Sequence, residues 1–404
     1  MRIAVVGANQ GVVGGAETYL TRFLTAFLAR GHQLAFAFEI PAEHGRAADQ
    51  GLEPIIRWNL REMTREAFLE DLARFNPDVV FLQGAMDPTL DFALAGRFCT
   101  VLFAHAFYGT CATGWRVHRI PQRQVCTRRF GAACLPMNYL RGCGARNPLR
   151  LLDLYTSQEK RLKVLDRLAA TVVASEYMRQ VYLEHGVPEQ DIHVIPYPLD
   201  GAPAQAPPPP SRSLDRVLFL GRLTSGKGCA KAVQAVARCQ RALKRTLHLT
   251  VAGEGPELER ARHLATQLGV KADFLGWVSS EQRQALLRDS DVLVVPSLWP
   301  EPFGIVGIEA ASVGVPAVGY GAGGIVDWLR PGHSGEQADS DGFRLRPLAA
   351  ALERALGNAE HHRRLQLGAW EMAFEYGSEQ HFSRLEKLLV DAQAREQNRA
   401  RSNP

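Results

Sequence analysis

The sequence lacks any long apolar run. No stretch approaches the roughly 18 apolar residues that a membrane-spanning helix needs, and the opening MRIAVVG enters a strand-like pattern without the apolar region of a signal peptide. Cysteine is scarce for a secreted disulfide framework, and the count of seven is odd. These absences predict a cytoplasmic protein in a reducing compartment.

Acidic residues are absent from residues 111–150, although the whole chain has a net charge of only +5. This segment contains eight arginines, so it carries +8 and the rest of the chain carries −3. These arginines are Arg116, Arg119, Arg123, Arg128, Arg129, Arg141, Arg146 and Arg150. The pattern predicts either an anion-binding surface or a basic face neutralised by acids from elsewhere in the fold. Few aromatic residues lie here, which disfavours nucleic acid as the partner.

The length of 404 residues predicts two domains. Short apolar runs alternate with stretches of helical period in both halves, which is typical of parallel strands joined by crossover helices. The runs in the first half are 3–6, 79–82, 101–104 and 171–174, and those in the second half are 216–220, 247–252, 272–275, 292–296 and 315–320. The fold class is therefore α/β, with two doubly wound Rossmann-like domains.

A proline-rich stretch separates the two halves. Residues 196–213 contain seven prolines in eighteen residues, which is typical of a stiff linker. We expect an N-terminal domain over 1–198 with an insertion at 107–155, a linker over 199–213 and a C-terminal domain over 214–365. A helical segment over 366–404 is expected to pack back toward the N-terminal domain and to end in a frayed tail.

The most informative stretch is residues 297–324, SLWPEPFGIVGIEAASVGVPAVGYGAGG. The apolar run 292–295 leads into a loop with Glu301 and Phe303-Gly304, and a helix is expected to begin near Ile305. Glu309 then lies about one turn inside that helix, so both glutamates are predicted to face one ligand. The alternative is a pair of solvated acids favoured by the start of a helix.

Glu301 and Glu309 form an E-x7-E motif, which resembles that of the retaining GT-B glycosyltransferases, the group of sucrose synthases, glycogen synthases and phosphatidylinositol mannosyltransferases. GRLTSGKG at 221–228, VAGEGPE at 251–257, FLGWV at 274–278 and the glycines through Gly324 also resemble this family, in the same order. The resemblance extends to 14–32 and 174–200 and leaves out 107–155. It implies two Rossmann-like domains that face a central cleft.

The resemblance implies roles for particular residues. Glu309 corresponds to the carboxylate that holds the donor ribose, and Glu301 to the residue that contacts the transferred sugar. The backbone N–H groups of Phe303 and Gly304 assist Glu301. Arg222 and Lys227 correspond to the cations that stabilise the leaving nucleoside diphosphate without a catalytic metal, although both also fit an exposed loop.

Two further features belong to the first half. Gly14 and Gly15 follow the first strand and open a helix, so backbone amides there are predicted to approach the donor diphosphate, unless they form only a tight turn. His105 ends the run 101–104 and resembles the family histidine near the transferred sugar and acceptor. A lone histidine is otherwise most often structural.

The insertion also contains four cysteines, Cys111, Cys126, Cys134 and Cys143. Four thiols in one short segment fit a structural zinc ion, but the spacing has no CxxC pair, so disulfides and unliganded thiols stay open. Because Cys111, at the start of the acid-free segment 111–150, lies six residues after His105, the arginines of this segment are predicted to lie beside the acceptor site.

The predicted function is retaining transfer of a hexose-type sugar from a nucleoside-diphosphate sugar to a glycan or lipid-linked acceptor. If the acceptor is anionic, its negative groups would bind the arginines of the insertion. Peripheral contact with the inner membrane surface follows from the same charge. The alternatives are a sugar phosphorylase or nucleotide-sugar epimerase on the same fold, and a non-catalytic nucleotide-sugar-binding protein. The sequence does not distinguish same-face attack from a covalent intermediate.

Overall fold

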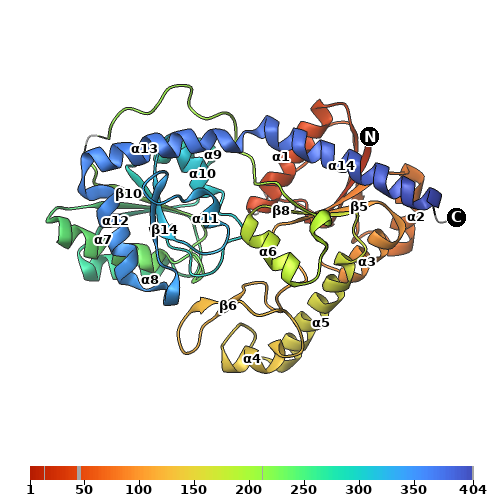
Figure 1. Ribbon diagram of the computed structural model, residues 1–404, viewed down its shortest axis with the longest axis horizontal. Helices are drawn as coiled ribbons and strands as arrows, with labels where there is room; N and C mark the ends of the chain where they lie inside the picture. The colour runs from red at the N-terminus through yellow and green to blue at the C-terminus, as the bar shows by residue number, and fades with distance from the viewer. Residues whose placement is uncertain (13, 43–46, 212, 403–404) are drawn as a thin grey trace. The chain divides into compact units, whose positions relative to one another are not determined.

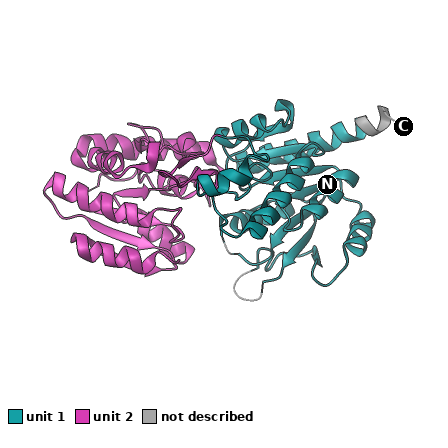
Figure 2. Ribbon diagram, turned by 90° about the horizontal axis from the view of Figure 1, so that it is seen from below, with its two compact units in different colours: residues 1–114, 128–197, 379–404 teal, residues 115–127, 198–378 magenta. Residues whose placement is uncertain are grey.

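The computed structural model describes residues 1–12, 14–42, 47–211 and 213–402 (Figure 1). The chain divides into two compact units, shown in different colours in Figure 2. Unit 1 consists of residues 1–114, 128–197 and 379–404, and unit 2 consists of residues 115–127 and 198–378. Among the described residues, no helix is both long and apolar enough to cross a bilayer.

Unit 1 is built on a seven-stranded parallel sheet in the order β3-β2-β1-β4-β5-β8-β9. Its strands are β1 (Arg2–Asn9), β2 (Gln33–Ile40), β3 (Ile55–Asn59), β4 (Val79–Leu82), β5 (Thr100–Ala104), β8 (Ala170–Val173) and β9 (Ile192–Val194). The central strands are buried along almost their whole length, as a sheet covered by helices on both faces requires.

The helices of unit 1 connect these strands or follow them. They are α1 (Gly15–Ala29), α2 (Arg65–Phe75), α3 (Pro88–Arg97), α4 (Cys134–Leu140), α5 (Pro148–Leu165), α6 (Glu176–Glu184), the 3-10 helix η1 (Glu189–Asp191) and α14 (Ser378–Ser402). Side-chain caps begin several of them; Asn147, for example, accepts from the backbone N–H groups of Leu149 and Arg150 at the start of α5.

Unit 2 has a six-stranded parallel sheet in the order β12-β11-β10-β13-β14-β15. Its strands are β10 (Arg216–Leu220), β11 (His248–Ala252), β12 (Lys271–Gly276), β13 (Val292–Val295), β14 (Ala317–Tyr320) and β15 (Gly335–Ala338). An antiparallel hairpin, β6 (Val117–His118) and β7 (Gln124–Val125), also belongs to this unit. The α/β class with parallel sheets is thus confirmed.

The helices of unit 2 surround this sheet. They are α7 (Cys229–Leu243), α8 (Leu258–Leu268), α9 (Ser280–Arg288), α10 (Val306–Ala311), α11 (Ile325–Trp328), α12 (Leu345–Gly357) and α13 (Ala359–Ala373), with the 3-10 helices η2 (Asp341–Phe343) and η3 (Phe374–Tyr376). The apolar face of α7 is buried in one core with β10, β11, β13 and α12.

The structure distributes the predicted segments as follows. From the predicted insertion 107–155, residues 115–127 pack with unit 2, whereas the rest belongs to unit 1. From the predicted segment 366–404, the end of α13 and η3 lie in unit 2, and α14 beyond its first residue lies in unit 1. The polar end that we expected to be frayed is helical as far as Ser402, and residues 403–404 lie outside the described chain.

Candidate active site

Both sheets reverse their strand order at one position, which is where open parallel sheets bind ligands. In unit 2 this switch point lies between β10 and β13, the two central neighbours from which the chain winds outward in opposite directions. The loop after β10 carries Arg222 and Lys227, and the loop after β13 carries Glu301. The residues predicted from the sequence therefore meet at the carboxyl ends of two adjacent strands.

Glu301 is the centre of a polar cluster at this point. Its side chain is only 5% exposed, and its Oε1 lies 2.7 Å from Lys227 Nζ. Ser297 Oγ donates to the same oxygen at 2.5 Å, and Trp299 Nε1 donates at 3.0 Å. A buried carboxylate with a cation and two neutral donors is held in one orientation, because any other rotamer would leave it unsatisfied.

The backbone around Glu301 is fixed by the glycine-rich turn after β14. Gly324 N donates to Glu301 O at 2.7 Å, and Gly323 adopts φ +69° against the same peptide. A Cβ on Gly323 would lie 2.3 Å from Glu301 O. The indole of Trp328 donates to Phe303 O at 2.7 Å, so the chain is also fixed just beyond Glu301. The Phe303-Gly304 segment is thus held next to the glutamate.

Glu309 is buried in α10 and lies in a separate ion pair. Its Oε1 is 3.3 Å from Arg283 Nη1 of α9, and both side chains are mostly shielded from water. Glu301 and Glu309 are therefore each paired with a different cation, Lys227 and Arg283. Arg283 gave no signal in the sequence, because it approaches Glu309 only through the fold.

Arg222 differs from Lys227 in its surroundings. It is exposed at the beginning of the loop after β10, and its carbonyl accepts from Thr224 N at 2.9 Å in a tight turn. Lys227 N donates to Thr224 O at 3.0 Å, so the loop folds back on itself between the two cations. An exposed guanidinium near the switch point is accessible to an anionic ligand.

The switch point of unit 1 lies between β1 and β4. Gly14 precedes α1 with extended backbone, and Gly15 is the first residue of the helix. Glu17 in the first turn accepts a hydrogen bond from Asn9 Nδ2 at 2.9 Å, which places a carboxylate beside the two glycines. This negative charge opposes close approach of a diphosphate unless a cation accompanies it.

His105 follows β5 and belongs to an aromatic cluster. Its Nδ1 lies 2.5 Å from Tyr197 Oη, and its Nε2 is hydrogen-bonded to Gln83 Oε1. Its ring stacks on Phe103 with centroids 4.9 Å apart. Burial lowers the pKa of His105 to about 3, so the imidazole is neutral at physiological pH. A neutral ring with both nitrogens engaged is suited to hydrogen bonding and poorly suited to general base catalysis.

His381 of α14 lies in the same aromatic cluster. Because His105 and His381 are both buried, we expect the stability of unit 1 to fall at acidic pH. Burial lowers the pKa of His381 to about 4, and its Nε2 lies 3.1 Å from Tyr19 Oη. The unfolded chain takes up a proton at each of these histidines below pH 6.5, whereas the folded chain does not until much lower pH. Stability should therefore fall as pH decreases from 7 to 5, by about 2 kcal/mol per histidine.

Denaturant unfolding followed at pH 7 and pH 5 measures this loss. His381→Gln removes one of the two groups, so its loss between the two pH values should be smaller than that of the wild type by about 2 kcal/mol. Equal losses in the two proteins would contradict the assignment of His381.

A small cavity of about 210 Å³ lies beside His105 in unit 1. Gln83, His105, Tyr108, Gln158 and Arg161 are among its lining residues. Arg161 Nη2 donates to Ala85 O at 2.9 Å, so its guanidinium is fixed at the cavity wall. This hollow at the carboxyl end of β5 has a mainly apolar wall with a few polar groups, and it has room for part of a sugar ring.

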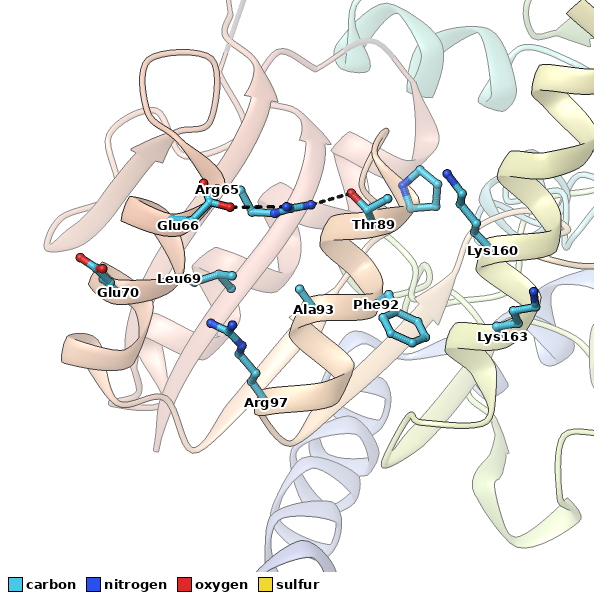
Figure 3. A pocket seen from close by; sticks show the side chains of 11 residues that line it. Arg65, Glu66, Leu69, Glu70, Thr89, Phe92, Ala93, Arg97, Lys160 and Lys163 are labelled. Carbon is cyan, nitrogen blue, oxygen red and sulfur yellow. Dashed lines mark hydrogen bonds and ion pairs between the residues drawn. The ribbon is translucent and has the colours of Figure 1, made fainter.

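A separate cavity of about 670 Å³ lies among α2, α3 and α5 (Figure 3). Phe92 and Leu69 form part of its apolar wall, and Arg65 is hydrogen-bonded to Thr89 at 3.0 Å. Lys160 and Lys163 face it from α5 (Figure 3). None of the sequence-predicted site residues lines this cavity, so it plays no part in the site described above.

The eight arginines of the insertion do not share one environment. Arg116 is only 2% exposed, and Arg123 donates to Ser225 O at 2.8 Å within unit 2. Exposed arginines in unit 1 are Arg128, Arg129, Arg146 and Arg150. Arg116 is buried in the hairpin, so an anion-binding surface on this segment would consist of its exposed arginines and not of Arg116.

The four cysteines of the insertion are divided between the units. Cys126 belongs to unit 2, and Cys111, Cys134 and Cys143 belong to unit 1. Within the described part of the chain, no group of three or more His, Cys, Asp or Glu side chains is arranged to hold a metal. The zinc ion stays a prediction, for which metal analysis of the purified protein is the direct measurement.

Comparison with known proteins adds to this geometry. Residues 13–201 match the family described as Glycosyltransferase Family 4, and residues 209–369 match the family described as Glycosyl transferases group 1. Each half of the chain is therefore similar to a different glycosyltransferase domain family. The described site residues of unit 2, from Arg222 to Glu309, all lie within the second match.

Curated relatives match parts of this chain. Glycogen synthase of Mycobacterium tuberculosis is 35% identical over 123 residues, which are 30% of this chain and 29% of the relative. D-inositol 3-phosphate glycosyltransferase of Corynebacterium glutamicum is 32% identical over 187 residues, which are 45% of this chain and 44% of the relative. The matched segments thus span less than half the length of these relatives.

Solved structures match nearly the whole chain in fold. Sucrose-phosphate synthase of Thermosynechococcus elongatus has a TM-score of 0.69 at 18% identity, covering 98% of this chain and 99% of that one. HepE of Anabaena, solved in complex with UDP and glucose, has a TM-score of 0.68 at 16% identity, covering 97% and 100%. The GT-B fold predicted from the sequence is confirmed.

Several residues that contact the predicted site residues were not predicted from the sequence. Ser297 and Trp299 precede Glu301 by four and two positions, and their hydrogen bonds to its carboxylate became evident only from the loop geometry. Gln83 and Tyr197 hold His105 from distant parts of the chain. Gln83 could have been found from the sequence, because it is a polar residue directly after the buried strand β4, where ligands of parallel sheets bind.

Proposed function

We propose that the protein is a retaining glycosyltransferase that uses a nucleoside-diphosphate hexose as donor and an anionic glycan or lipid-linked molecule as acceptor. The observation that carries this proposal is the Lys227–Glu301 cluster at the switch point of unit 2, with Arg222 exposed on the same loop. A cation held against a buried carboxylate, with a second cation exposed on the same loop, is suited to a ligand that joins a diphosphate to a sugar.

The reaction breaks the bond between the anomeric carbon and the diphosphate oxygen, and the bonding pair leaves with the nucleoside diphosphate. Lys227 and Arg222 are proposed to stabilise the added negative charge. An acceptor hydroxyl forms the new bond to the anomeric carbon on the face that the diphosphate leaves, and its proton passes to the departing phosphate oxygen. Retention follows from this same-face geometry, and product anomeric configuration measures it.

Substrate positioning is assigned to the remaining residues. Glu301, with the adjoining Phe303-Gly304 backbone, is proposed to hold hydroxyl groups of the transferred sugar. Glu309 is proposed to accept hydrogen bonds from the donor ribose. Gly14 and Gly15 would admit the diphosphate from unit 1, and neutral His105 would hydrogen-bond the sugar or acceptor beside its cavity.

A panel of nucleotide sugars tests the donor assignment. The true donor at 100 times its dissociation constant should stabilise the fold by roughly 2.7 kcal/mol, which thermal unfolding detects. Incubation with acceptor, water or inorganic phosphate then distinguishes transfer from hydrolysis, phosphorolysis and epimerisation. Binding without any product in all arms would identify a non-catalytic nucleotide-sugar-binding protein and contradict the proposal.

Catalysis should survive removal of divalent cations, because Arg222 and Lys227 supply the positive charge that a metal provides elsewhere. Activity in excess EDTA should stay within about twofold of the untreated enzyme. Complete loss that magnesium or manganese restores would contradict this prediction, and loss that zinc alone restores would point to the cysteines of the insertion.

Peripheral membrane contact is proposed for the α4–α5 region. Tyr139, Leu140, Leu149 and Leu152 are between 49% and 76% exposed, which is high for large apolar side chains. Arg146 and Arg150 are exposed in the same stretch, and residues 111–150 have no acid. Apolar side chains flanked by arginines are suited to an anionic lipid surface.

Replacing Arg128, Arg146 and Arg150 together with glutamine should weaken acceptor use and binding to vesicles of anionic lipid. We expect the acceptor KM to rise about tenfold at low salt, and by less as salt increases, because exposed charges are screened over about 8 Å at physiological ionic strength. Donor affinity should not change. An acceptor KM unaffected by both the substitutions and the salt would contradict the anionic acceptor.

A further inference from the structure

The hairpin of residues 115–127 packs with unit 2, although the segments before and after it in the sequence belong to unit 1. The chain leaves unit 1 after Gly114, forms β6 and β7, and returns to unit 1 at Arg128. Val117 is 4% exposed and lies in the hydrophobic core of unit 2, against which Val125 also packs. The hairpin is therefore anchored in unit 2 by buried apolar contacts.

Trp115, at the start of this hairpin, lies between the two loops of the candidate active site. Its ring is 5.0 Å from that of Trp299 at an interplanar angle of 60°. It also packs on Gly226, where an added Cβ would lie 2.7 Å from Trp115 Cζ3. Trp115 thus touches the residue that precedes Lys227 and an indole that holds Glu301.

Arg123, on the other side of the hairpin, fixes the same loop. Its Nη1 donates to Ser225 O at 2.8 Å, which is two residues before Lys227. Burial lowers the pKa of Arg123, and the nearby Arg119 adds to this effect, whereas Glu257 opposes it. A guanidinium that loses part of its hydration for one backbone carbonyl contributes chiefly by positioning that carbonyl.

The loop and Glu301 are in turn connected directly. Leu298 N donates to Gly226 O at 2.7 Å, and Lys227 Nζ lies 5.8 Å from the Trp299 ring centroid. Trp299 Nε1 donates to the carboxylate that pairs with Lys227. Trp115 therefore contacts Gly226 on one side of the Lys227–Glu301 pair and Trp299 on the other, and these two loops are also hydrogen-bonded to each other.

We propose that the hairpin 115–127 is a positioning element of the donor site, in which Trp115 and Arg123 hold the 224–228 loop and Trp299 so that Lys227 and Glu301 are ready for the donor diphosphate sugar. This inference rests on the proposed donor role of Lys227. Trp115 and Arg123 are positioning residues, since they act through Gly226, Ser225 and Trp299.

The first test uses hydrogen exchange of the ligand-free protein. The amides of Lys227 and Leu298 donate to Thr224 O and Gly226 O within the loops that Trp115 covers. Trp115→Ala should increase their exchange at least tenfold, and Trp115→Phe should restore most of the protection. Trp277→Ala is the matched control, because Trp277 belongs to the same unit and is 73% exposed. Unchanged exchange in Trp115→Ala would overturn the proposal.

The second test measures function with UDP, GDP and ADP as binding probes and with the donor found in the panel. Trp115→Ala and Arg123→Gln should each weaken binding of the accepted diphosphate and lower kcat about tenfold, with the acceptor KM unchanged. Arg238→Gln, at an exposed position of α7, is the control for Arg123→Gln. Wild-type affinity and kcat in both hairpin variants would overturn the proposal.

A parallel Lys227→Ala variant separates failure of this inference from failure of the proposed function. If Lys227→Ala binds the diphosphate as the wild type does, the donor assignment is wrong, and the hairpin proposal is wrong with it. If Lys227→Ala loses affinity while Trp115→Ala and Arg123→Gln do not, only the hairpin proposal is overturned. Faster turnover in Trp115→Ala would identify a lid that opposes entry and would also overturn it.

Discussion

Lys227→Ala should lower kcat about 100- to 1000-fold while the protein stays folded. The Lys227 ammonium lies 2.7 Å from a buried carboxylate and at the strand ends where the donor is proposed to bind. Its charge is needed most when the diphosphate leaves, and loss of one such fixed contact costs on the order of 3 kcal/mol of transition-state stabilisation. Steady-state kinetics at saturating donor, with circular dichroism as the check on folding, measures the effect.

The matched control is Lys271→Ala, which removes an exposed lysine from β12 of the same unit and should leave kcat unchanged. Arg222→Ala should also lower kcat strongly, because its guanidinium is proposed to stabilise the leaving diphosphate. Since the Arg222 side chain is exposed, its loss should not unfold the protein. If folded Lys227→Ala and Arg222→Ala both turn over near the wild-type rate, the phosphate assignment is wrong.

The same lysine also has a structural consequence. Lys227→Ala leaves the Glu301 carboxylate buried without its cation, with Ser297 and Trp299 as donors among the described residues, which should lower the free energy of unfolding by about 1–3 kcal/mol. Adding Glu301→Gln removes the unpaired charge and should recover part of that loss. Denaturant unfolding of the single and double variants therefore separates the stability contribution of the pair from its kinetic contribution.

Several strands that are mostly buried and apolar could be predicted from the sequence. The runs 79–82 and 292–295 coincide with β4 and β13, since a strand covered on both faces needs apolar residues throughout. The run 216–220 coincides with β10, which is buried apart from its two ends. β15 was not predicted, because its sequence, GEQA, has no apolar run. The polar side chain of Glu336 is instead paired with Arg354 and His361. The strand conformation of β15 follows from pairing with β14, which no local pattern reports.

The candidate site was predictable only in part, for a related reason. Lys227 and Glu301 follow strands with recognisable patterns, so their meeting could be inferred from the strand order of a doubly wound sheet. Trp115 and Arg123 lie in a segment without a regular apolar period, more than 100 positions before the loop that they contact. Such contacts depend on the path of the hairpin into unit 2, and a single sequence does not encode that path in any local pattern.

Gly323→Ala should disrupt both the fold of unit 2 and the position of Glu301. Gly323 has φ +69°, where alanine costs about 1–2 kcal/mol, and an added Cβ would lie 2.3 Å from Glu301 O and 2.6 Å from Glu301 N. Because those atoms belong to the backbone, no rotamer change relieves the overlap. We expect the free energy of unfolding to fall by about 3 kcal/mol or more, and kcat to fall with it.

Gly332→Ala is the control that separates backbone strain from displacement of the site. Gly332 has φ +74°, close to that of Gly323, but nothing lies within 4 Å of the position of its Cβ. Its substitution should therefore cost only the conformational term of about 1–2 kcal/mol and leave kcat unchanged. Equal losses of stability and activity in the two variants would mean that the contact between Gly323 and Glu301 does not position the carboxylate. A loss of kcat confined to Gly323→Ala, measured at a temperature where both variants are folded, would follow from movement of Glu301 away from Lys227.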